Sequence, residues 1–261
     1  MSRAPSFFIS HGAPMFAIEP DALSDYLTAL GSSLAHINAV LLISPHWQTR
    51  DLCVMTTPQP ETIHDFSGFP EVLYTLQYPA KGSPEWAKQL VQLMGEQGIV
   101  VREDASRGLD HGAWVPLMYL FPKANVPVFQ LSMPVGLTAG SALQLGVALR
   151  SLRDRGVLVL GSGGFTHNLY EISPKNSVPE GYIKLFGDWM REAVVARDFE
   201  RLANYRKLAP HAERAHPTDE HLLPLLVALG ASFDEDPLHI ESGDIYYGML
   251  AMESYFWGLA D

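Results

Sequence analysis

Residues 157–167 read Val-Leu-Val-Leu-Gly-Ser-Gly-Gly-Phe-Thr-His, a short apolar run that leads through glycines to a histidine. Two other runs have the same form: 7–11 reads Phe-Phe-Ile-Ser-His, and 40–46 reads Val-Leu-Leu-Ile-Ser-Pro-His. Short apolar runs without alternation are typical of strands buried on both faces of a parallel sheet. The carboxyl ends of such strands lie at one edge, where open α/β folds bind ligands. We therefore expect His11, His46 and His167 to gather there.

The rest of the chain alternates predicted strands with helical patterns. Strands are expected near 6–10, 39–44, 52–57, 99–103, 126–132 and 157–160, and helices at 21–30, 84–96, 139–155, 181–196, 199–207 and 219–229, before an apolar segment at 245–257 that returns as a strand. This order predicts one α/β domain over residues 1–261. Its central, mostly parallel sheet is covered by helices, and a metal site lies at the carboxyl ends of the strands.

Composition restricts the partners and the compartment. The chain has 18 Lys and Arg and 29 Asp and Glu, which gives a net charge of -11. This charge would repel nucleic acid and anionic membranes, and it favours a small-molecule partner. Cys53 is the only cysteine, which excludes an internal disulfide and a thiolate metal cage. With no signal-like segment and no apolar run long enough to span a bilayer, we expect a cytoplasmic protein. No heptad or separable interface segment indicates an oligomeric state.

The histidines at the predicted strand ends are the candidate metal ligands. A lone histidine after a strand is as often structural, but the repeated placement favours ligation by His11 and His46. The glycines before His167 lack the Lys-Ser/Thr pair of a P-loop and the spacing of a dinucleotide fingerprint, so we expect them to make room for substrate. His167 is then either a further ligand or an unligated acid/base.

Three more histidines are candidates. The acid before His111, Asp110, is expected to bond one imidazole nitrogen and fix the tautomer, leaving the other nitrogen for substrate. His64 is expected to line the pocket. His221 would lie near the start of the helix at 219–229, capped by Thr218 and facing inward. His36, His211 and His239 are expected to be structural or on the surface.

A histidine-rich site without cysteine suits Fe(II), Zn(II) or another borderline cation. Three protein ligands with open positions would support catalysis, whereas a closed tetrahedral shell would indicate a structural zinc. The residue types alone do not choose among these metals.

Six segments together resemble the DOPA-dioxygenase branch of the class III extradiol ring-cleaving dioxygenases, related to the protocatechuate 4,5-dioxygenase catalytic subunit superfamily. They read Ser-His-Gly-Ala-Pro-Met (10–15), Ser-Pro-His-Trp (44–47), Ile-His-Asp-Phe through Gly-Phe-Pro (63–70), Leu-Asp-His-Gly-Ala-Trp (109–114), Thr-His-Asn-Leu (166–169) and His-Pro-Thr through a second His (216–221). The match is collinear and spans nearly the whole chain.

The resemblance implies a non-haem Fe(II) enzyme that opens a catechol ring beside the diol. Both atoms of O2 enter the product, an open-chain semialdehyde. By motif, His11 and His46 correspond to the first two iron ligands and His221 to the third, where the wider class has a carboxylate. The resemblance assigns the acid/base role to His167 and the orientation of substrate or oxygen to His111.

Three questions stay open at this point. Glu220 or Glu241 is a possible carboxylate ligand, and a set of neutral histidines would also hold Zn(II). Arg50 and Arg107 are candidates for binding a substrate carboxylate, although surface solvation is the commoner role. The competing functions are a zinc-dependent hydrolase and a non-enzymatic metal-binding protein on the same scaffold.

Overall fold

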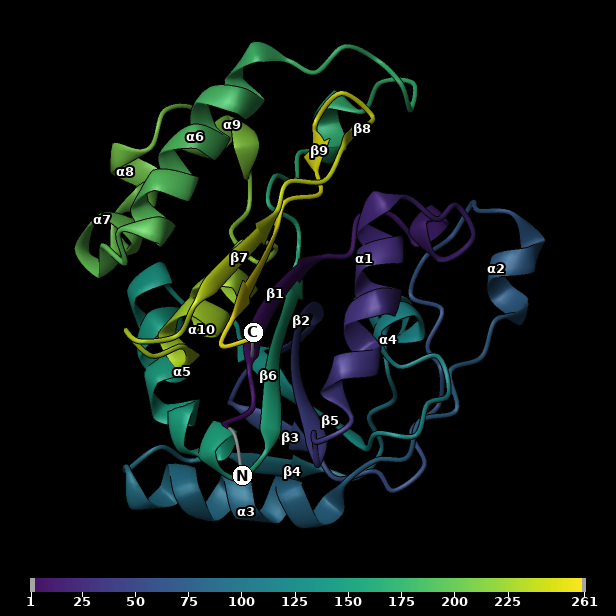
Figure 1. The fold of residues 1–261 in the computed structure, drawn as a ribbon, viewed down its shortest axis with the longest axis vertical. Coiled ribbons are helices and arrows are strands. Elements are labelled where there is room, and N and C mark those ends of the chain that lie inside the picture. The colour runs from purple at the N-terminus through teal and green to yellow at the C-terminus, as the bar shows by residue number, and fades with distance from the viewer. Residues whose placement is uncertain (1–2, 260–261) are drawn as a thin grey trace.

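The computed structural model describes residues 3–259, and these form one large sheet with helices on both faces (Figure 1). The strands are β1 (Ser6–Ser10), β2 (Ala39–Thr49), β3 (Cys53–Met55), β4 (Arg102–Asp104), β5 (Val128–Pro134), β6 (Val157–Gly163), β7 (Leu238–Glu241), β8 (Ile245–Tyr246), β9 (Leu250–Ala251) and β10 (Ser254–Trp257). Among the described residues, eight strands make the main sheet in the order β4-β3-β5-β2-β6-β1-β10-β7, and β8 pairs with β9.

The centre of the sheet is parallel. β6 pairs in parallel with β1 on one side and with β2 on the other, and β2 pairs in parallel with β5. These strands are buried along most of their length because helices cover both faces, which is why their sequences are continuously apolar. The antiparallel pairs lie outside this centre, at β3-β5, β1-β10 and β10-β7. The predicted single α/β domain with a mostly parallel sheet is confirmed, and the first and last two residues of the expected 1–261 range lie outside the described part.

Two helical layers cover the sheet (Figure 1). The helices are α1 (Ala22–Gly31), α2 (Glu71–Thr75), α3 (Pro84–Glu96), α4 (His111–Leu120), α5 (Ala139–Asp154), α6 (Gly181–Val195), α7 (Phe199–Ala203), α8 (Tyr205–Leu208), α9 (Ala212–Ala215) and α10 (Leu223–Ala231), with short 3-10 turns η1 (Pro14–Ala17), η2 (Ser32–Leu34) and η3 (Leu169–Glu171). α10 packs between the sheet and α5, and α4 with α1 lies on the other side. Every residue of α10 is buried, which explains why it is apolar all round.

Several predicted elements differ from the structure. β2 continues past 44 to Thr49, with a register shift between Ile43 and Gln48, so His46 lies inside a bulged strand and not beyond its end. The helix predicted at 219–229 begins only at Leu223. The predicted cap, Thr218, instead donates its hydroxyl to Glu220.

Further differences come from short elements. The helix predicted at 199–207 is divided into α7 and α8, and the apolar segment at 245–257 contains three short strands instead of one. α4 was not predicted, because it is apolar on all sides and contains Pro116.

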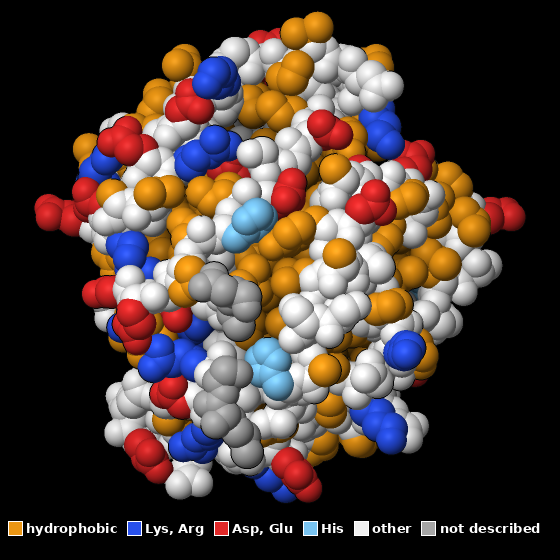
Figure 2. Space-filling model, in the orientation of Figure 1, with side chains coloured by type: hydrophobic (Ala, Val, Ile, Leu, Met, Phe, Trp, Pro, Cys, Tyr) orange, Lys and Arg blue, Asp and Glu red, His pale blue; other side chains and the backbone are white. Residues whose placement is uncertain are grey.

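The surface is mixed in charge. In the view of Figure 2, acidic and basic side chains are interspersed over the face. Within residues 3–259, no helix is both long and apolar enough to cross a membrane.

Candidate metal centre

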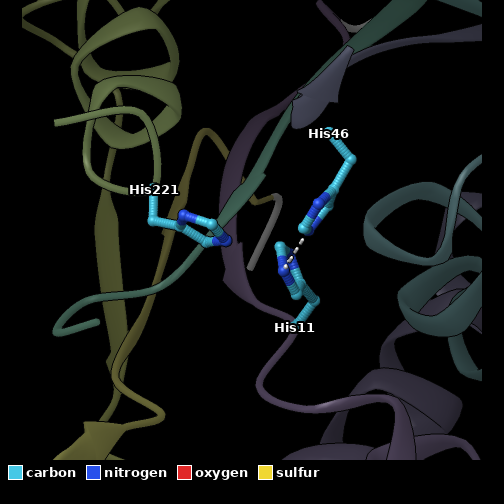
Figure 3. A group of neighbouring side chains, drawn as sticks. All are labelled: His11, His46 and His221. Atoms are coloured by element: carbon cyan, nitrogen blue, oxygen red, sulfur yellow. Dashed lines mark hydrogen bonds between the residues drawn. The ribbon is translucent and has the colours of Figure 1, made fainter. Parts of the chain in front are cut away.

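Three histidines from separate parts of the chain meet at the carboxyl edge of the parallel strands (Figure 3). His11 follows β1 directly, His46 lies in the last part of β2, and His221 comes from the loop before α10. One ring nitrogen from each lies within 4.8 Å of the others. The Nε2 atoms of His11 and His46 are 3.2 Å apart, and His221 points toward this pair from the opposite side.

The tautomer of His11 is set by Ser162 on β6. Nδ1 of His11 lies 2.9 Å from the Ser162 hydroxyl oxygen, and that hydroxyl donates its own hydrogen to the Gly112 carbonyl. The Gly112 carbonyl is free to accept because Pro116, four residues on in α4, has no backbone N–H. The serine oxygen must therefore accept from Nδ1–H. Nε2 of His11 then carries no hydrogen, and its lone pair is available to a metal ion.

Carboxylates lie behind the other two rings. Nδ1 of His221 is 3.1 Å from Oε1 of Glu220, within hydrogen-bond distance, whereas Nδ1 of His46 faces Oδ2 of Asp65 at the longer distance of 3.5 Å. A carboxylate oxygen accepts, so His221 carries its proton on Nδ1 and keeps Nε2 free. An acceptor behind the imidazole, as at His11 and His221, is characteristic of metal-ligating histidines.

The spacing of the two closest nitrogens also fits a cation. Nε2 of His11 and Nε2 of His46, 3.2 Å apart, can share one hydrogen when no metal is bound. Two metal–nitrogen bonds of about 2.1 Å at a right angle place their nitrogens roughly 3 Å apart. The donor set therefore fits a divalent metal held by three neutral imidazoles.

Burial keeps these imidazoles neutral. It lowers the pKa values of His11 and His221 well below the usual 6.5, and burial together with the nearby His111 lowers the pKa of His46 to about 4. Burial raises the pKa of Asp65, but hydrogen bonds from His111 outweigh it and bring the value to about 2. At neutral pH the site thus offers neutral nitrogens and an ionised carboxylate, as metal binding requires.

Two further histidines stand beside the three. His111 opens α4, and both its Nδ1 and its backbone N–H bond Oδ1 of Asp65, at 3.0 and 2.9 Å. The expectation that Asp110 holds His111 is wrong. Asp110 is fully buried and accepts hydrogen bonds from Ser44, Arg107 and Gln130.

His167 stacks on His221, with ring centroids 3.5 Å apart and planes 6° apart. Burial lowers its pKa to about 4. Among the described residues, ring nitrogens of His11, His46 and His221 lie within 4.8 Å of one another, and His167 is not part of this group. His167 instead forms a second such group with Glu220 and His221.

The glycines before His167 serve packing and not substrate. A Cβ at Gly161 or Gly163 would lie 2.2 Å from the backbone oxygen of Pro224 or His221 respectively. The lead-in to α10 therefore approaches β6 only because these side chains are missing, and this approach delivers His221 to the edge of the sheet. The expected space for substrate lies elsewhere.

That space is a cavity of about 460 Å³ beside the histidines. It is lined by His11, Gly12, Ala13, Pro14, His46, Asp65, Phe66, Phe69, His111, His167, Leu169, Ile172, His221, Tyr247, Met249 and Leu250. Its volume is within the range of small-molecule sites. The sequence reading missed Asp65, Phe66 and Phe69 as lining residues, although the His-Asp-Phe motif and the following Gly-Phe-Pro contain them.

Other candidates are not brought to the cavity. Nε2 of His64 bonds the Leu76 carbonyl at 3.1 Å, and His64 is not among the described lining residues. Arg50 is exposed, and Arg107 bonds Asp110 and the His46 carbonyl. Glu241 pairs with Ser254 in the sheet, whereas Glu220 lies behind His221 as its hydrogen-bond acceptor.

Comparison with known proteins agrees with this geometry. Residues 5–256 match the family described as the catalytic LigB subunit of aromatic ring-opening dioxygenase. The chain belongs to this family of metal-dependent enzymes and is an extradiol dioxygenase, which acts on an aromatic diol and O2.

Named relatives and a solved structure extend over nearly the whole chain. A protein from Beta vulgaris named 4,5-DOPA dioxygenase extradiol is 38% identical over 96% of this chain and 95% of its own. One of the same name from Escherichia coli K12 is 34% identical, covering 97% and 94%. The crystal structure of an uncharacterized protein from Escherichia coli K12 superposes with a TM-score of 0.82 at 29% identity, covering 97% of this chain and 99% of that one.

Proposed function

We propose that the protein is an Fe(II)-dependent dioxygenase that cleaves a catechol-type ring next to its diol. Both atoms of O2 enter the product, which is a semialdehyde. The single observation that carries this proposal is the convergence of ring nitrogens from His11, His46 and His221 on a cavity large enough for a substituted ring. The relatives' names, 4,5-DOPA dioxygenase extradiol, support a catechol as the substrate.

The three histidines would hold the metal, and bound Fe(II) would supply a redox-active Lewis acid that brings the diol and O2 together. The set is uncharged, so Zn(II) suits the same nitrogens. Zinc in a purified sample would therefore not contradict iron-dependent catalysis. Glu220 acts through His221 by fixing its tautomer.

His167 is the acid/base of this proposal. It borders the cavity, its lowered pKa keeps it unprotonated at neutral pH, and it is not part of the group formed by His11, His46 and His221. An unprotonated imidazole can take a proton from a diol hydroxyl and return it later. Its stacking on His221 keeps the ring in place over the metal-binding edge.

His111 orients the substrate. Asp65 accepts from Nδ1 of His111, so the opposite nitrogen, Nε2, is an acceptor for a hydroxyl group. Phe66 packs edge-on against His111, with centroids 5.7 Å apart, and supplies an apolar surface for an aromatic ring. Together they would hold the ring with its diol toward the metal ligands.

The test is oxygen uptake, recorded with ultraviolet-visible spectra, on protein reconstituted anaerobically with Fe(II) and mixed with catechols in air. The metal-free protein and a His46→Ala variant are the controls. Oxygen consumption matched by growth of a yellow semialdehyde chromophore supports the proposal. No uptake despite verified iron occupancy would contradict it, and hydrolysis of an ester by the zinc-loaded protein would point to the hydrolase alternative.

A further inference from the structure

The regular pairing of β2 is interrupted where the strand carries His46. Its last pair with β6 joins Ile43 to Gly161, and its pairing with β5 shifts register between Ile43 and Gln48. The segment between these positions bulges out of the regular ladder. From this segment His46 points toward His11 (Figure 3). The ladder that fixes the rest of β2 is therefore interrupted at a candidate metal ligand.

Side chains bind the backbone of His46 at this point. The N–H of His46 donates to the Ser44 hydroxyl oxygen at 3.3 Å, and the carbonyl of His46 accepts from Nη2 of Arg107 at 3.2 Å. The Arg107 guanidinium also lies over the ring of Trp47, 5.2 Å from the centroid. Both polar groups of the His46 backbone are thus held by side chains.

The two side chains that hold His46 meet at Asp110. Ser44 donates its hydroxyl to Oδ1 of Asp110 at 2.6 Å, and Nη2 of Arg107 donates to Oδ2 at 2.7 Å. Gln130 on β5 adds a third donor, 3.0 Å from Oδ2. The side chain of Asp110 is fully buried and that of Arg107 is only 17% exposed, so water screens these charge-assisted bonds little.

Asp110 does not take the role that its position favours. It stands at the N-cap of α4, where an aspartate side chain commonly accepts from a backbone N–H of the first turn. Its side chain makes no such bond and turns to Ser44 and Arg107 instead. Gly112 makes room for this arrangement, because a Cβ there would lie 2.5 Å from the Ser44 hydroxyl oxygen and 2.9 Å from Cδ2 of His46. The start of α4 is therefore shaped around the His46 segment.

From these contacts we propose that Asp110 is a positioning residue for the metal centre. Through Ser44 and Arg107 it fixes the backbone of His46, and so the direction in which the imidazole of His46 meets the metal. Asp110 acts from behind, since it is not among the described residues that line the cavity. The inference rests on the proposed function, because the position of His46 matters in this way only if His46 is a ligand. Arg107, a candidate for binding a substrate carboxylate, is committed to Asp110 and His46 instead.

Asp110→Asn tests this role at nearly constant side-chain size. An amide offers one acceptor and one donor where the carboxylate offers two acceptors, so either Ser44 or Arg107 loses its acceptor. The matched control is Asp236→Asn. Asp236 forms a buried ion pair with Arg153, which also bonds the Ala4 carbonyl before β1, at the opposite edge of the sheet from the histidines.

The probe is Co(II), titrated into metal-free protein against a chelator, because its visible absorption bands also report ligand geometry. We expect Asp110→Asn and Ser44→Ala each to weaken Co(II) binding about tenfold and to change the bands at saturating Co(II). The double variant should lose much less than the roughly 100-fold product expected of independent sites. Asp236→Asn should lose unfolding free energy and keep the wild-type affinity and bands. A merely structural role for Asp110 would not alter the bands of folded, metal-saturated protein.

The contrary outcomes are distinct. Wild-type affinity and bands in folded Asp110→Asn would overturn the inference, and so would an equal loss of affinity in Asp236→Asn. If Asp110→Asn does not fold, Ser44→Ala decides alone, and wild-type Co(II) binding by that variant overturns the inference. His46→Ala separates the two proposals. Wild-type Co(II) binding by His46→Ala would contradict the proposed metal centre itself, whereas a loss confined to His46→Ala would contradict only the role of Asp110.

Discussion

Replacing Ser162 by alanine should weaken metal binding without touching a ligand. In the native site the Ser162 oxygen accepts from Nδ1–H of His11, and this keeps Nε2 unprotonated. Without that oxygen the His11 proton is expected to move to Nε2, where it bonds Nε2 of His46 across the 3.2 Å gap. Metal must then displace this proton. Loss of such an outer hydrogen bond typically costs ~10-fold to 100-fold in metal affinity, or about 1.4 to 2.8 kcal/mol.

The matched control is Ser132→Ala. Ser132 is also fully buried in a strand of the same sheet, where it bonds Thr49 and the Cys53 N–H, away from the histidines. Both variants should lose about 1 to 3 kcal/mol of unfolding free energy in the metal-free protein, because Ser162→Ala leaves the Gly112 carbonyl without its hydroxyl donor and Ser132→Ala leaves the Cys53 N–H without its acceptor. Only Ser162→Ala should lose affinity for Zn(II) in competition with a chromophoric chelator. Equal affinities in the two variants would refute the tautomer argument.

Other expectations follow from the same contacts. His167→Ala should abolish turnover and leave bound iron per chain unchanged; a parallel loss of iron would make His167 a ligand. Glu220→Ala should weaken Zn(II) binding by ~10-fold to 100-fold in chelator competition, because His221 loses its hydrogen-bond acceptor; unchanged affinity would exclude that role. Burial lowers the pKa of His216 to about 4. Between pH 6.5 and 4, His216 is therefore protonated in the unfolded state but not in the folded state, and the free energy of unfolding falls as the pH drops. His216→Gln should remove up to about 3 kcal/mol of that pH dependence in denaturant titrations, and the exposed-site variant His36→Gln is the matched control.

The sheet and two of the three candidate ligands could be predicted from local signals. His11 and His46 each follow an apolar run, and the parallel strands bring such positions to one edge regardless of loop details. His221 had no comparable strand signal. Its place depends on the close approach of the lead-in to α10 at Gly163, a tertiary contact that the sequence pattern does not display.

The acids behind the histidines show why the remainder could not be predicted. Asp110 precedes His111 and was the natural partner by proximity, but its side chain turns into the core toward Ser44 and Gln130. Asp65, 46 residues away, takes its place. α4 was not predicted because Pro116 is unfavourable inside a helix. In the structure Pro116 leaves the Gly112 carbonyl free to accept from Ser162. A proline inside α4 thus contributes, through the Gly112 carbonyl and Ser162, to fixing the tautomer of His11.

X-ray absorption at the metal edge of the Fe(II)-loaded protein tests the three-histidine centre most directly. It counts the imidazoles around the metal and measures their bond lengths. The geometry of His11, His46 and His221 predicts three imidazole nitrogens at about 2.0 to 2.2 Å, with the remaining positions filled by oxygen from water. A shell with fewer than three imidazoles, or with a fourth supplied by His167, would contradict this account of the site.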